Sequence, residues 1–253
     1  MVMQWAENFA CQKSDKVISL LWNSEDHYKE CGLPEGRFAC VPNGYAADEW
    51  DPQAASLSIP EEHQKLFDSL KDKIIVGFAG GFAASGAMDT FIEAANILKQ
   101  NNKIVFVMVG KGPEKENYEK LIKKYGLNNV HILPAVPKKL IPAINSHFDI
   151  AYMGGVHSVL HKYGTSYNKM TDYMLAGRPI IQAIDEPGSI AERTGCGIQV
   201  EAENPQLIAQ EITKLAMLSK GEREAMGKKG KIYAIDNLEW GTLSKRFLQY
   251  MGM

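Results

Sequence analysis

Short apolar runs alternate along this chain with longer segments in which apolar residues recur every three or four positions. The short runs are typical of buried strands, and the longer segments of amphipathic helices. The predicted strands cover residues 17–21, 38–41, 74–79, 104–109, 130–133, 149–152, 179–183 and 197–200. The predicted helices between the later strands cover residues 87–98, 114–124, 138–145, 168–176, 188–193, 205–218 and 222–235. This alternation predicts an α/β fold with a doubly wound parallel sheet.

The first fifty residues do not complete a domain. An amphipathic stretch at 5–12 leads to a strand, a helix that begins at Ser24, and a second short strand. These few elements cannot bury a core of their own, so we expect them to be the tail of an N-terminal domain whose body is absent from the chain. Residues 51–60 are rich in Pro, Ser and Ala and are predicted to form a linker.

Composition excludes several classes of protein. The 253 residues are 45% hydrophobic and 23% charged, with a net charge of −2. A nucleic-acid binder would show a basic face, and a disordered chain would have fewer apolar residues. No apolar run reaches the roughly 18–20 residues of a membrane span, and the start of the chain lacks a secretory signal. The four cysteines are far apart in sequence without a C-x-x-C motif, which favours reduced thiols of a cytoplasmic protein over disulfides or zinc.

Two glycine-rich segments follow predicted strands. The first is Gly77-Phe78-Ala79-Gly80-Gly81-Phe82-Ala83-Ala84-Ser85-Gly86, and the second is Val109-Gly110-Lys111-Gly112-Pro113. Glycines let backbone approach an anion, so we take Gly80, Gly81, Ser85, Gly110 and Lys111 as candidate phosphate-binding residues. Neither segment matches the G-x-G-x-x-G or Walker pattern. A tight turn explains the first segment equally well, and for Lys111 taken alone a solvated loop lysine is favoured over a phosphate contact.

The most informative segment runs from residue 163 to residue 181. Small polar residues, with candidates Ser166 and Tyr167, precede a predicted helix that begins at Asn168. The helix amides and Lys169 are suited to a diphosphate, and Asp172 lies one turn after Asn168, where it suits a ribose diol. The alternative is an ordinary helix with an Asn cap and an acidic residue in its first turn.

The sequence gives little support for a metal site or for the nucleophile of a hydrolase. His157 and His161 have the i, i+4 spacing of helical metal ligands, but the glycines around them favour a loop. The chain contains no D-x-D and no G-x-S-x-G motif. We therefore predict no metal and no cofactor.

These segments together resemble the family 4 retaining glycosyltransferases. The donor-binding motif of that family is similar to Asn168-Lys169-x-x-Asp172-Tyr173-Met174-x-Ala176-Gly177-Arg178-Pro179-Ile180. Val41-Pro42-Asn43-Gly44 resembles its interdomain segment, and Leu238-Glu239-Trp240 the start of its last helix. The stretch from Asn129 to Pro137, which contains the candidate Val136, resembles the strand and loop that frame the nucleotide base.

The resemblance implies a GT-B fold, in which two Rossmann-like domains face each other across a cleft. Residues 1–50 would be the tail of an incomplete acceptor domain with an interdomain linker, residues 51–236 the nucleotide-sugar-binding domain, and residues 237–253 a helix that returns toward the N-terminal domain. The resemblance also implies metal-independent transfer of a hexose-type sugar to a glycan or lipid-linked acceptor. The donor would be a UDP-sugar, which is favoured over a GDP-sugar. The catalytic groups, and any attachment at the inner membrane face, would then lie in the absent acceptor domain.

The chain departs from the family pattern at three places. Gly164 stands where the family has its first glutamate, and Asp172 stands at the second. Phe82-Ala83-Ala84-Ser85 replaces the basic residues that commonly hold the diphosphate. These departures resemble a bacterial branch that transfers amino or deoxy sugars during surface-polysaccharide assembly.

Two other functions remain open at this stage. One is a nucleotide-sugar-binding subunit that a separate partner completes, with apolar residues 1–9 and Trp22 at the interface. The other is a GT-B-type nucleotide-sugar epimerase, for which the sequence offers no convincing acid–base pair.

Overall fold

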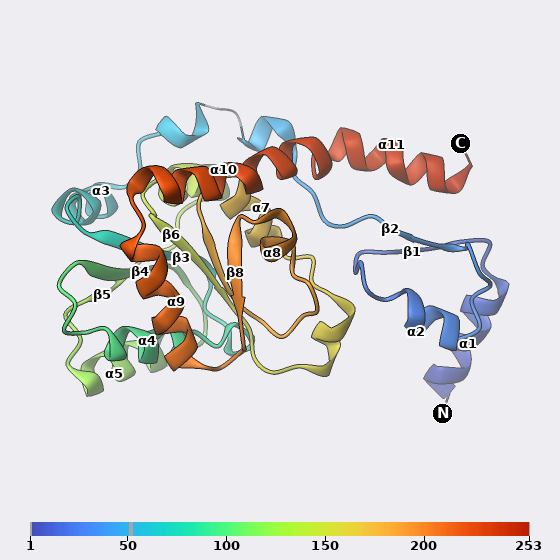
Figure 1. The fold of residues 1–253 in the computed structure, drawn as a ribbon, viewed down its shortest axis with the longest axis horizontal. Coiled ribbons are helices and arrows are strands. Elements are labelled where there is room, and N and C mark those ends of the chain that lie inside the picture. Colours follow the sequence, from blue (N-terminus) through green and yellow to red (C-terminus); the bar gives the residue numbers. More distant parts are fainter. Residues whose placement is uncertain (1, 51–52, 253) are drawn as a thin grey trace.

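The computed structural model describes residues 2–50 and 53–252, which form an α/β fold (Figure 1). Its main sheet has six parallel strands in the order β5-β4-β3-β6-β7-β8. These strands are β3 (Ile74–Gly81), β4 (Ile104–Lys111), β5 (Val130–Leu133), β6 (Ile150–Gly154), β7 (Ile180–Ala183) and β8 (Gly197–Val200). The strand order reverses between β3 and β6, and open sheets of this kind bind ligands at that switch point, beyond the carboxyl ends of the strands.

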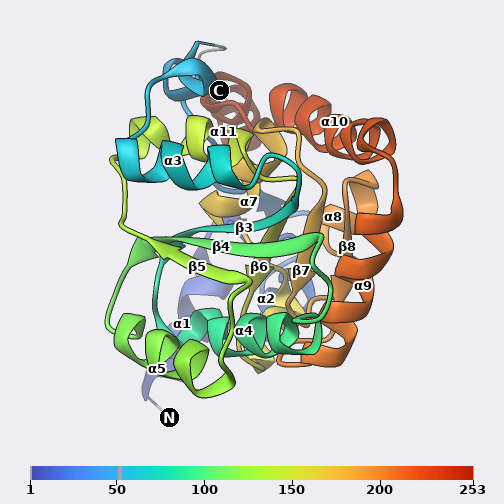
Figure 2. The same ribbon diagram turned by 90° about the vertical axis from the view of Figure 1, so that its left-hand side faces the viewer.

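Helices cover both faces of the main sheet (Figure 2). One face packs against α3 (Glu61–Ser69), α6 (Ile141–Ser146), α7 (Asn168–Leu175), α8 (Ile190–Thr194) and α10 (Lys220–Asn237). The other face packs against α4 (Met88–Ile97), α5 (Lys115–Tyr125) and α9 (Pro205–Met217). Successive β4 residues belong alternately to the two cores, as expected of a strand buried on both sides.

The N-terminal elements lie away from the main sheet in Figure 1. They are α1 (Val2–Lys13), β1 (Val17–Ser19), α2 (Glu25–Glu30) and β2 (Phe38–Cys40). The strands β1 and β2 form a separate two-stranded parallel sheet, over a small cluster of Cys11, Cys31 and Leu33. The last helix, α11 (Trp240–Met251), runs from the main body toward this region. The Tyr45 N–H donates to the Leu238 carbonyl, which ties the chain after β2 to the start of α11.

All eight predicted strands are present, and each predicted helix has a counterpart. The predicted strands 74–79 and 104–109 end two residues too early, because β3 and β4 continue through Gly81 and Lys111. The predicted linker is also more ordered than expected: a 3-10 helix covers Ala54–Ser56, although residues 51 and 52 lie outside the described residues. The helix α3 was missed. Within 2–50 and 53–252, no helix is both long and apolar enough to cross a membrane.

Candidate functional site

The glycines at the ends of β3 and β4 bring two strands into unusually close contact. Gly80 pairs with Gly110, and Gly81 with Lys111. A Cβ atom on Gly110 would lie 1.9 Å from the Gly80 carbonyl oxygen, so no larger residue fits there without moving backbone. A Cβ on Gly81, in contrast, would meet no atom within 4 Å. Gly110 therefore has a packing role, whereas the exposed Gly81 leaves open space at the sheet edge.

The helix α7 places Lys169 over the end of β3. The Lys169 ammonium lies 3.9 Å from the centroid of the Phe78 ring, and a Cβ on Gly80 would lie 2.9 Å from Lys169 Nζ. Gly80 thus leaves the space that the lysine occupies. Desolvation lowers the pKa of Lys169 to about 8, although Asp172 opposes this shift. A bound anion would relieve the cost of this desolvated cation.

The chain before α7 is held from the N-terminal side. The Asn43 N–H donates to Ser166 Oγ, and Asn43 Nδ2 donates to the Ser166 carbonyl, both at 2.7 Å. Tyr167 is the N-cap residue of α7, and its side chain makes no capping bond. Asn168 therefore begins the helix and does not cap it, which corrects the alternative drawn from sequence. Like other first-turn amides, those of Asn168 and Lys169 have no partner among the hydrogen bonds of the described residues.

Asp172 lies one turn along α7, at the wall of a cavity of about 450 Å³. Trp50 Nε1 donates to Asp172 Oδ1 at 3.1 Å, and Lys138 forms an ion pair with Glu49 nearby. Burial is the main cause that raises the Asp172 pKa to about 6; the Trp50 hydrogen bond and the Lys138 charge oppose it. The cavity is lined by Asp48, Glu49, Trp50, Gln53, Ala54, Leu57, Lys138, Lys139, Ile141 and Asp172.

This shift predicts a pH-dependent effect of Asp172→Asn on stability. A raised pKa means that the group stabilises the fold below its unfolded pKa of about 4 and loses that contribution as pH rises through about 6. The asparagine retains an acceptor for Trp50 but has no charge to desolvate. We expect the free energy of unfolding of the variant, relative to wild type, to rise by about 1 kcal/mol from pH 5 to pH 8. Urea unfolding at the two pH values measures this difference, and a constant difference would contradict it.

The structure explains why a glutamate is absent at position 164. Gly164 has a φ of +93°, and a Cβ there would lie 2.5 Å from the indole nitrogen of Trp22. Trp22 comes from the N-terminal region, so its ring fills the space that a side chain at 164 would need. The sequence departure is therefore a packing requirement between Trp22 and this loop.

Three candidates lie at the same sheet edge without joining Lys169 or Asp172. Ser85 is exposed, and its carbonyl accepts from the Val156 N–H, which links the loops that follow β3 and β6. Lys111 is exposed at the end of β4, and Val136 is partly buried after β5. Among the described residues, the side chains of these three make no hydrogen bond or ion pair with Lys169 or Asp172.

The His157 and His161 side chains have different hydrogen-bond partners. His157 Nδ1 lies 2.6 Å from Asp185 Oδ2, and this hydrogen bond raises the His157 pKa. His161 Nε2 lies 3.3 Å from the Tyr167 hydroxyl. The pair therefore does not converge on a common position.

Sequence reasoning missed Trp50 and Phe78 as site residues. Trp50 precedes the predicted linker, and only the rarity of an aromatic ring in such a segment could have drawn attention to it. Phe78 sits inside a strand, where apolar character alone explains it. The buried Tyr173, whose hydroxyl accepts from the Ala79 N–H at 3.1 Å, was quoted only as part of a motif; it docks α7 on β3.

Comparisons with known proteins match this chain to one family. The profile of the family "Glycosyl transferases group 1" matches residues 73–217, which is more than half of the chain. An alpha-D-kanosaminyltransferase of Streptomyces kanamyceticus is 28% identical over 151 residues, or 57% of this chain and 38% of the relative. A glycosyl transferase of Escherichia coli (strain K12) named for colanic acid biosynthesis is 26% identical over 157 residues, or 59% of this chain and 37% of the relative. The chain thus spans less than two fifths of the length of these two curated relatives.

The structure of Anabaena Alr3699/HepE in complex with UDP and glucose superposes with a TM-score of 0.74 at 18% identity. The match covers 98% of this chain and 65% of that chain. At this identity the likeness shows the fold alone, and it confirms the predicted GT-B type of α/β fold.

Proposed function

This chain belongs to the glycosyl transferases of group 1, and from that premise we propose that it is the donor-binding half of a metal-independent, retaining, family 4-type glycosyltransferase. Its substrate is a UDP-sugar held at the carboxyl edge of β3 and β6. The observation that carries the proposal is the placement of Lys169 and Asp172 on the first turns of α7, at the switch point of the sheet.

Each part of a nucleotide diphosphate finds suitable groups at this edge. The diphosphate lies by Gly81, where backbone is open, and receives hydrogen bonds from Lys169 and the first amides of α7. The ribose lies against Asp172, whose carboxylate accepts from the diol. The base lies near Val136, in the loop after β5. Gly80, Ser85, Gly110, Lys111, Ser166, Tyr167 and Asn168 complete the proposed site.

The sugar and the acceptor are proposed from the relatives. The named kanosaminyl and colanic acid transferases support an amino or deoxy hexose and a bacterial polysaccharide pathway. The Anabaena protein was solved with UDP and glucose, which supports UDP over GDP. In the complete enzyme Lys169 and the α7 amides stabilise the departing diphosphate as the sugar–oxygen bond breaks. A glycan or lipid-linked acceptor would bind an acceptor domain on the N-terminal side.

We propose that residues 1–50 belong to that acceptor domain, residues 51–236 form the donor domain, and residues 237–253 return to the N-terminal side. One observation favours a second candidate, a binding subunit completed by a separate protein. The outer side of α1 exposes Val2, Met3, Trp5 and Phe9. A partner that provides the acceptor domain would cover this apolar surface. In either arrangement the 253-residue chain binds donor but transfers sugar poorly.

Thermal unfolding with UDP, GDP, ADP and NAD at equal excess tests the proposal. At about 100 times its dissociation constant a ligand stabilises the fold by about 2.7 kcal/mol, which for a chain of this size raises Tm by roughly 5–11 °C. We expect a selective shift with UDP that is lost in Asp172→Ala. A shift of equal size with every nucleotide would reject the preference for UDP, and a shift that Asp172→Ala leaves intact would reject the assigned ribose contact.

The affinity for UDP-glucose should depend on pH in a bell shape. Below about pH 6 Asp172 becomes protonated and accepts less well from the ribose. Above about pH 8 Lys169 loses its charge and attracts the diphosphate less. UDP-glucose is the suitable probe because both of its phosphates are esterified and keep a constant charge over this range. Calorimetric titrations from pH 5 to pH 9.5 test this, and Lys169→Met should abolish the alkaline limb alone.

A further inference from the structure

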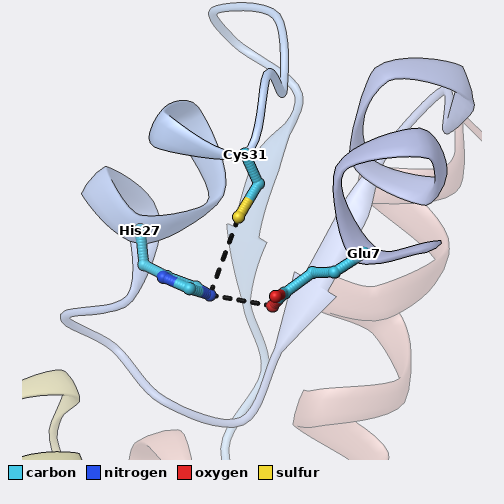
Figure 3. Close-up of side chains that lie close together, drawn as sticks. All are labelled: Glu7, His27 and Cys31. Carbon is cyan, nitrogen blue, oxygen red and sulfur yellow. Dashed lines mark hydrogen bonds and ion pairs between the residues drawn. The ribbon is translucent and has the colours of Figure 1, made fainter. Parts of the chain in front are cut away.

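Three side chains of different chemistry converge between α1 and α2 (Figure 3). Glu7 comes from α1, and His27 and Cys31 lie four residues apart on one side of α2 and at its end. His27 Nε2 lies 2.8 Å from Glu7 Oε1 and 3.8 Å from Cys31 Sγ. All three donor atoms lie within 4.8 Å of one another.

We propose that Glu7, His27 and Cys31 bind one divalent transition-metal ion, with Zn²⁺ as the preferred metal. Tetrahedral zinc with ordinary bond lengths separates its nitrogen, oxygen and sulfur ligands by about 3.3–3.6 Å. The observed separations bracket this range, so side-chain shifts below an ångström would complete the site. A thiolate, an imidazole and a carboxylate together favour zinc over the hard ions Mg²⁺ and Ca²⁺.

The fourth coordination position would be taken by a water molecule, as in other zinc sites with three protein ligands. Cys11 is buried and belongs to the same hydrophobic cluster as Cys31. Its sulfur is not among the donor atoms that lie within 4.8 Å of one another. The Gln4 amide donates weakly to Cys31 Sγ at 3.7 Å and would be displaced by the metal. Glu7 and His27 are partly exposed, which leaves a path for the ion.

The second nitrogen of His27 is placed as in many metal-binding histidines. Its Nδ1 lies 3.4 Å from the Tyr163 hydroxyl, and the two rings are 5.2 Å apart. Outer partners of this kind fix the ring and its tautomer so that the other nitrogen faces the metal. Tyr163 ends a short 3-10 helix between β6 and α7, so the ion would join the N-terminal helices to the segment that leads into α7.

The small hydrophobic core of the N-terminal region also favours a structural metal. Among the described residues, its hydrophobic cluster has three buried members, two of which are Cys11 and Cys31, and partly buried side chains from Val17, Tyr28 and Phe38 pack against them. A core of that size contributes little, and small folds commonly add a structural metal to hold their helices together. The metal would act as a cross-link between α1 and α2.

Cobalt titration of the chelator-treated 253-residue chain tests the proposal. Co²⁺ that binds a thiolate gives a charge-transfer absorption and, in tetrahedral sites, intense d–d bands. We expect one equivalent to bind, with Zn²⁺ displacing it. Cys31→Ser should abolish the charge-transfer band. Loss of a residue that only hydrogen-bonds a metal ligand weakens metal affinity by about 10–100-fold. His27→Gln removes a ligand itself, so we expect it to weaken Co²⁺ binding by more than that. Cys40→Ser, a cysteine on β2 outside the cluster, is the matched control and should bind like wild type.

Two results would overturn the site. One is the absence of a thiolate band in the wild-type chain, which would leave Glu7 and His27 as a simple ion pair. The other is a band that Cys31→Ser and His27→Gln retain, which would place the metal elsewhere. Tyr163→Phe leaves every ligand in place and gives a second test: about tenfold weaker Zn²⁺ binding is expected from loss of the Nδ1 partner, and unchanged binding would contradict the assigned role of Tyr163.

Discussion

Lys169→Met is expected to weaken UDP binding by roughly 10- to 150-fold. A hydrogen bond to a charged group contributes about 1.5–3 kcal/mol, and Lys169 is the cation seated at the proposed diphosphate position. Methionine has a similar length and packs well on the Phe78 ring, so the change removes charge without leaving a large void. Isothermal titration with UDP measures the loss.

The same substitution should raise stability while it lowers affinity. Burial lowers the Lys169 pKa from about 10.5 to about 8, so the folded state disfavours the charged form at pH 7. After allowance for the cation–π contact, we expect the free energy of unfolding to increase by about 1–2 kcal/mol. Lys123→Met, an exposed lysine on α5, is the control and should change neither quantity. If Lys169→Met loses stability and keeps its UDP affinity, Lys169 supports the fold and does not bind the diphosphate.

Gly110→Ala should be the most damaging single change at the sheet edge. The new Cβ would lie 1.9 Å from the Gly80 carbonyl oxygen and 2.8 Å from the Phe82 ring. The first of these is backbone, so relief requires the ends of β3 and β4 to separate. Overpacking of this kind costs about 1–3 kcal/mol or more, and we expect the upper end of that range. Urea unfolding of the variant and the wild type gives the difference.

Gly81→Ala is the matched comparison on the neighbouring residue. Its Cβ would enter open space, so stability should remain within about 0.5 kcal/mol of wild type. If the diphosphate lies against this backbone, the methyl group occupies part of its space and UDP affinity falls. The pair therefore separates packing from binding: Gly110→Ala should lose stability, and Gly81→Ala should lose affinity alone. Full affinity in Gly81→Ala would move the phosphate away from β3.

Most of the fold could be predicted because several of the sheet strands are almost wholly apolar. Runs such as the one in β4 have no polar face to confuse the period, and glycines with positive φ, such as Gly126 and Gly195, mark helix ends. The boundaries of β3 and β4 could not be predicted. Glycine normally weakens a strand, and only the close contact between Gly80 and Gly110 explains why these strands continue.

Only part of the candidate site could be predicted from the sequence. Lys169 and Asp172 lie on one short helix, so their spacing alone brings them together. Trp50 and Asp172 are 122 residues apart, and nothing in local sequence predicts their hydrogen bond. The glycine at position 164 also depends on a long-range contact, because Trp22 from the N-terminal region fills the space that a side chain there would need. Long-range contacts of this kind follow from packing and not from spacing.

A crystal structure of the 253-residue chain with UDP would test the central claim most directly. The account predicts the diphosphate within hydrogen-bond distance of Lys169 Nζ and the amides of Asn168 and Lys169, with the ribose hydroxyls on Asp172. UDP bound at another edge of the sheet, or bound here without contact to Lys169 and Asp172, would contradict the account.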